Sequence, residues 1–105
     1  MKDMTEYQIF IGFQDSQHGR EMVSEEELRT MISDFFKRNK TDFSILSAKG
    51  GYISNDGVFV SENSLCINII GASEDKIIRL AKNLSMFMNQ ESALIVKNKI
   101  KADFC

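Results

Sequence analysis

Two segments of this chain carry the periodicity of an amphipathic helix, and both begin in the same way. Residues 24–40 and 73–88 place apolar side chains three and four positions apart, which is the spacing of one helix face. Ser24 and Ser73 precede acidic residues at the two starts. A hydroxyl there can accept a hydrogen bond from an exposed amide, and negative charge is favoured. The sequence therefore predicts two helices, each with one buried face.

Four further segments have the pattern of β-strands. Residues 6–14 and 94–104 alternate between apolar and polar side chains, which is typical of strands with one buried face. Residues 43–53 and 58–70 are apolar segments joined through Asn55-Asp56-Gly57. Because these turn residues tolerate a positive φ, they predict a long hairpin.

The middle of this hairpin departs from a regular strand pattern. Gly50-Gly51 in one strand and residues 61–64 in the other interrupt the apolar positions. Such interruptions are typical of a β-bulge or a bend. We therefore expect the ladder to twist at this point.

The order strand, helix, strand, strand, helix, strand predicts an α+β fold, the ferredoxin-like βαββαβ sandwich. We expect both helices to cover one face of a four-stranded antiparallel sheet, with the first and third strands in the centre. The opposite sheet face is then open. No proline and no linker interrupts the chain, so residues 1–105 are expected to form a single α+β domain.

Charge and composition exclude several classes of function. Thirteen basic and fifteen acidic side chains give a net charge of -2, which is too small to direct the chain to nucleic acid or to an anionic membrane. The apolar runs are far shorter than the roughly 20 residues that cross a bilayer, and the first residues lack the basic start of a secretory signal. We expect a cytoplasmic protein with no membrane contact, in which Cys66 and Cys105 are free thiols.

The open sheet face is the first candidate for a function. The alternation of the strands predicts that it presents Phe10, Cys66, Asn68, Ile70, Lys97, Lys99 and Lys101. A face that is half apolar and half basic requires a cover or a ligand, and we expect copies of the chain to pack through it. The alternative is a solvated edge strand whose lysines discourage aggregation. Nucleic acid is disfavoured, because no aromatic ring lies between Leu65 and Ile70 to stack on a base.

The loop at residues 15–21 is the second candidate. It carries His18 and Arg20 just before a helix, where backbone amides can hold an anion. His18 is the sole histidine, so a two-histidine metal site is excluded. No sequence motif for a cofactor, a metal or an activated nucleophile occurs, and we expect neither cofactor nor metal. A hydrated loop is the alternative interpretation.

Short patterns along the chain resemble a bacterial family of small α+β proteins that is known only as a domain of unknown function. They are Ile11-Gly12-Phe13, Val23-Ser24, Gly51-Tyr52, Glu62-Asn63-Ser64 and Gln90-Glu91-Ser92-Ala93-Leu94. The resemblance implies the same architecture and no particular reaction. It also implies that Glu62, Gln90 and Glu91 belong to the functional residues.

Taken together, the residues favour a non-enzymatic binding or protein-interaction module that forms a dimer or higher oligomer through its sheet. Its partner would be a protein or a small molecule. One alternative is a small enzyme that uses His18 or a partly buried glutamate, Glu62 or Glu91, as the proton carrier. A glutamate of this kind more commonly caps backbone amides. Another alternative is an accessory or inhibitor protein of a mobile element.

Overall fold

The computed structural model of the chain describes residues 1–12, 14–15, 20–21, 24–88 and 93–105, and only the backbone of residues 14–15 and 20–21. Its elements, in chain order, are β1 (Lys2–Gly12), β2 (Gln14–Asp15), β3 (Arg20–Glu21), α1 (Glu25–Arg38), β4 (Ser44–Ile53), β5 (Phe59–Ile70), α2 (Glu74–Phe87) and β6 (Leu94–Ala102). The first strand therefore begins four residues earlier than the alternation predicted.

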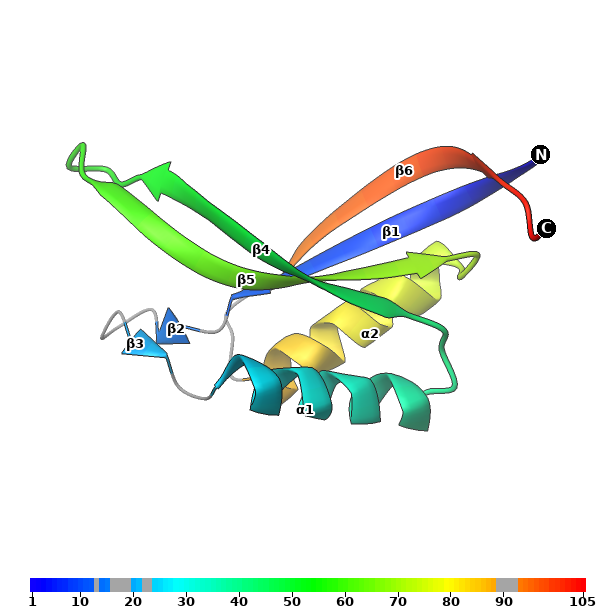
Figure 1. Cartoon of the computed structure of the whole chain (residues 1–105), viewed down its shortest axis with the longest axis horizontal. Coiled ribbons are helices and arrows are strands. Elements are labelled where there is room, and N and C mark those ends of the chain that lie inside the picture. The colour runs from blue at the N-terminus through cyan, green and yellow to red at the C-terminus, as the bar shows by residue number, and fades with distance from the viewer. Residues whose placement is uncertain (13, 16–19, 22–23, 89–92) are drawn as a thin grey trace.

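The four long strands form one antiparallel sheet in the order β4-β5-β1-β6. The first and third long strands, β1 and β5, lie in the centre, as predicted. Both helices cover the same face of this sheet (Figure 1). The α+β fold of the ferredoxin-like kind is thus confirmed, and no helix of the described residues covers the other face of the sheet.

A short ribbon interrupts the segment that was predicted to be a loop. β2 and β3 pair through Gln14 with Glu21 and through Asp15 with Arg20. Since this ribbon lies next to the start of α1 in Figure 1, it extends the molecule at the end where β1 stops.

The helices begin where the sequence predicted, because both serine caps form. The hydroxyl of Ser24 accepts a hydrogen bond from the amide of Glu27 at 3.1 Å, and Ser73 accepts one from Lys76 at 3.3 Å. The apolar faces of the helices meet the inward side chains of the central strands. This core consists of Tyr7, Ile9, Ile11, Leu28, Ile32, Phe35, Phe36, Leu65, Ile67, Ile69, Ile77, Leu80, Ala81 and Leu84.

The β4–β5 hairpin is paired from end to end. Its register runs without an extra residue from Ser44 opposite Asn68 to Ile53 opposite Phe59, so of the two predicted alternatives, a β-bulge or a bend, the β-bulge does not form. The ladder survives its glycines because an aromatic ring covers one of them. A β-carbon at Gly51 would collide with the Phe59 ring and would lie 2.9 Å from the carbonyl oxygen of Val60.

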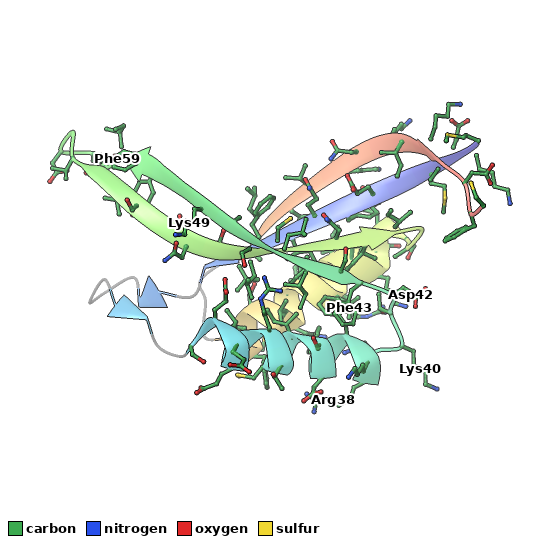
Figure 2. The ribbon with its side chains drawn as sticks, viewed as in Figure 1. Arg38, Lys40, Asp42, Phe43, Lys49 and Phe59 are labelled. Atoms are coloured by element: carbon green, nitrogen blue, oxygen red, sulfur yellow. The ribbon has the colours of Figure 1, made fainter. Side chains whose placement is uncertain are left out.

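The hairpin and the β1–β6 pair diverge from the middle of the sheet, and both rise away from the helices (Figure 1). Figure 2 shows Phe59 near the far end of the hairpin, and Lys49 on the stretch of the hairpin that extends past the described helices. In the same view Asp42 and Phe43 lie beside the end of α1. The uncovered sheet face is therefore the inside of a broad V.

Candidate functional site

The strand register determines which side chains lie on the uncovered sheet face. Ile9 and Ile11 are buried against the helices, so their neighbours in β1 point to the opposite, uncovered face. Residues that pair across antiparallel strands share a face, and three successive cross-strand rows result. We call them the small-residue row (Ala48, Ser64, Gly12), the aromatic row (Leu46, Cys66, Phe10, Leu94) and the amide row (Ser44, Asn68, Gln8, Val96).

The carboxylate of Glu62 reaches over the small-residue row. Glu62 pairs with Gly50 in the hairpin, on the same face as Gly12. A β-carbon built on Gly12 would lie 2.9 Å from Oε1 of Glu62, so the carboxylate occupies space that only glycine leaves free. Glu62 was expected to be partly buried, and this is wrong: it is exposed, because its side chain lies on the sheet face opposite the helices.

The aromatic row gives the face an apolar floor next to this carboxylate. Phe10 is half-buried, while Leu46 and Leu94 are 54% and 62% exposed. Tyr52, at the other side of Glu62, is 52% exposed and pairs with Val60. The carboxylate thus has apolar and aromatic neighbours on both sides along the strands.

The thiol of Cys66 is held in its neutral form within the aromatic row. Burial raises the pKa of Cys66, and the negative charge of Glu6 raises it further. Its Sγ donates to Oδ1 of Asn68 in the amide row at 3.6 Å. Because a protonated thiol is a poor nucleophile, we assign Cys66 a packing role.

The lysines of β6 lie on the other face of the sheet, which corrects the prediction. Lys97 pairs with Tyr7, whose side chain is buried against the helices. Its Nζ lies 2.9 Å from Oε1 of Glu74 at the start of α2, and this carboxylate raises the pKa of Lys97. Lys99 is on the same face.

Lys101 shares this face and lies 2.5 Å from the carboxylate of Asp3. The physical reason for the error is that alternation separates two faces without saying which one the helices cover. The apolar positions Leu94, Val96 and Ile100 occupy the uncovered face instead. That face is therefore more apolar than the sequence predicted.

Of the other predicted site residues, Phe10, Asn68 and Glu62 lie on the uncovered face. His18, Gln90 and Glu91 lie outside the described residues, and at Arg20 only the backbone is described. Sequence reasoning missed Gln8, which alternation placed opposite the buried Tyr7 and Ile9. It also missed Tyr52, although the resemblance had marked Gly51-Tyr52.

Two shallow hollows lie away from the uncovered face. One is lined by the α2 residues Asp75, Ile78, Arg79, Lys82 and Asn83. The other is lined by Lys37, Lys40, Thr41, Asp42 and Phe43, and Figure 2 shows Lys40 pointing into solvent there. Neither combines a carboxylate with an aromatic floor and amides. We therefore take the uncovered face as the candidate site.

Within the part of the chain that the structure describes, no three histidine, cysteine, aspartate or glutamate side chains gather as a metal site would require. None of the described helices is long and apolar enough to cross a membrane.

Comparisons with known proteins find matches among solved structures alone. No protein-family model matches the chain, and no curated protein does. Among solved structures, the fold is similar to that of a phage SAM lyase in complex with S-methyl-5′-thioadenosine. The TM-score is 0.65 with 24% identity, over 94% of this chain and 90% of that one. A phage SAM lyase in the apo state is similar with a TM-score of 0.62 and 22% identity, over 96% and 91% of the two chains.

This likeness overturns the prediction of a non-enzymatic binding module, because two solved structures that share the fold over nearly the whole chain are those of an enzyme. The alternative of an accessory or inhibitor protein of a mobile element stays a prediction. The predicted resemblance to a bacterial family of unknown function stays a prediction.

Proposed function

We propose that this protein is a lyase that cleaves S-adenosylmethionine (SAM) and releases S-methyl-5′-thioadenosine, with Glu62 and its surroundings on the uncovered sheet face as the substrate site. The observation that carries the proposal is the fold match, over 94% of this chain, to a phage SAM lyase in complex with S-methyl-5′-thioadenosine. The candidate site supports it independently, because it joins a carboxylate to an apolar, partly aromatic floor.

The substrate has a chemistry that suits this arrangement. SAM carries a positive sulfonium beside a flat adenosine, and a carboxylate attracts such a cation. The ring of Tyr52, exposed and two residues from Gly50 along β4, can add a cation–π contact. The adenosine can lie along the aromatic row, and Gly12 leaves room for the carboxylate.

The bond that must break lies between the sulfonium and the amino-acid chain. Its electron pair stays on sulfur, which becomes the neutral thioether of the product. We propose that the substrate's own carboxylate closes on the freed carbon and forms a lactone. Atoms and charges then balance without a proton acceptor, so Glu62 acts as a binding group and not as a base.

The polarity of the face favours this step. A carboxylate and a sulfonium lose their charges as the new bond forms and the old one breaks, so water stabilises the reactants more than the transition state. An apolar floor such as Phe10, Leu46 and Leu94 replaces some of that water. Glu62 interacts with a charge that disappears during the reaction, so its contribution is to substrate binding.

The proposal is tested by incubating the purified chain with SAM. Chromatography then measures S-methyl-5′-thioadenosine and the four-carbon lactone. We expect thioadenosine and lactone in equal amounts. Glu62→Gln is expected to raise KM roughly twofold to fivefold, as for an exposed charge pair, with a smaller change in kcat.

Glu26→Gln, at an exposed glutamate of α1, is the matched control and is expected to behave as the parent. If the parent releases no thioadenosine above the uncatalysed rate, the proposed activity is wrong. A vinyl amino acid in place of the lactone would show that a base removes a proton and would refute the closure step.

A further inference from the structure

We propose that the amides of Gln8 and Asn68 read the base edge of adenine and so set the nucleobase specificity of the uncovered face; this inference rests on the proposed SAM-cleaving function. Both side chains belong to the amide row and face each other directly across β1 and β5. An amide offers one donor group and one acceptor, and this is the pairing that the adenine edge requires.

The position of the amide row fits the length of the nucleoside. Gly12, over which the Glu62 carboxylate lies, is four residues from Gln8 along β1. At about 3.3 Å per residue this is a separation of about 13 Å, which shortens when the Gln8 and Asn68 side chains reach back along the face. With its sulfur at Glu62, an adenosine laid on the aromatic row turns its base edge towards these two amides.

The row between the two ends is suited to hold the base itself. It contains Phe10 beside Leu46, Cys66 and Leu94, and a ring on an apolar floor favours stacking with a flat base. The thiol of Cys66 donates to Oδ1 of Asn68. This contact turns the amide oxygen of Asn68 towards the aromatic row and leaves its NH₂ group free of any hydrogen bond to the described residues.

The contacts of the other amide on the uncovered face show which amide side chains remain available to a ligand. In the next row Nδ2 of Asn98 donates to Oε1 of Glu6 at 3.4 Å, so that amide is engaged by a neighbouring carboxylate. Gln8 makes no such contact with another described side chain. Two amides of one row thus remain for a ligand, while the third amide of the face does not.

The test uses S-methyl-5′-thioadenosine and its deaminated analogue, S-methyl-5′-thioinosine, as probes, because deamination exchanges the donor at position 6 for an acceptor. Dissociation constants are measured by calorimetry for the parent chain, Asn68→Leu and Gln8→Met. We expect the parent to bind the adenine form roughly tenfold more tightly. Each variant should reduce this preference to about threefold or less by weakening the adenine form.

Asn98→Leu is the matched control, since it removes an amide of the same face outside the proposed contact, and it should keep the parent's preference. Circular dichroism identifies a variant that fails to fold, in which case Asn68→Ser and Gln8→Ala replace it. A parent that cleaves SAM and an unchanged preference in both variants would overturn this inference alone. A parent that cleaves SAM but binds neither nucleoside would likewise overturn this inference alone, whereas a parent that releases no S-methyl-5′-thioadenosine from SAM would overturn the proposed function and this inference together.

Discussion

The missing side chain of Gly12 leaves the space that the carboxylate of Glu62 occupies in the candidate site. A methyl group at this position would meet Oε1 of Glu62 at 2.9 Å, and the flexible glutamate is the partner that can move. Gly12 has no positive φ, so alanine is compatible with the backbone. The position therefore separates two effects that most substitutions combine, the stability of the sheet and the placement of the carboxylate.

We predict that Gly12→Ala keeps the fold and raises KM for SAM severalfold, because the carboxylate is displaced from the small-residue row. The free energy of unfolding should change by less than about 1 kcal/mol, the usual scale for glycine against alanine in a strand. Steady-state kinetics and urea unfolding measure the two quantities.

Gly50→Ala is the matched control, since a β-carbon at Gly50 meets no atom of the described residues within 4 Å. It should change neither KM nor the fold. Equal kinetic effects of both substitutions would show that the carboxylate over Gly12 has no part in binding.

At the scale of elements, the β4–β5 hairpin extends past the helices and depends on its turn for order. The hydroxyl of Ser54 donates to the carboxylate of Asp56, and the amide of Val58 donates to Oδ1 of Asp56 at 3.4 Å. These hydrogen bonds, that from Ser54 first, lower the pKa of Asp56 from its ordinary value of 3.8. Charged Asp56 therefore favours the folded turn.

The sign of the resulting pH dependence is fixed, because a lowered pKa in the folded state means that protonation weakens the turn. The stabilisation is complete above pH 3.8 and is lost as the pH falls through the lower folded value. We predict that the NMR amide resonance of Val58 stays constant down to about pH 4 and shifts only at lower pH. In Asp56→Asn this titration should be absent. A midpoint at or above 3.8 would contradict the assignment.

The element scale is also where sequence analysis succeeded and failed. Both helices followed from periodicity, because the helix period is a local property. The serine caps followed from residue type at the helix starts, and the central position of β1 and β5 followed from the crossover rule applied to the order of elements. The face of Lys97 and Lys99 did not, since it depends on the register of β6 against β1. The contact between Glu62 and Gly12 was also hidden, because the two residues are 50 positions apart in sequence and meet only through the β1–β5 register.

At the scale of the whole molecule, the uncovered face and the end of the hairpin leave apolar side chains exposed. Tyr52, Ile53, Val58 and Phe59 are each more than half exposed near the hairpin end, and Figure 2 shows Phe59 far from the helices. Such an apolar cluster is typical of a contact surface. The expected homo-oligomer stays a prediction, which light scattering checks. The cytoplasmic location likewise stays a prediction.

The central claim is that the uncovered sheet face binds the nucleoside part of SAM, and an NMR titration of the labelled chain with S-methyl-5′-thioadenosine tests it most directly. We predict that the largest amide shifts cluster in β1 and β5, at Gln8, Phe10, Gly12, Ser64 and Cys66, with little change in α1 and α2. Saturable shifts confined to the helices, or none at millimolar nucleoside, would contradict the account.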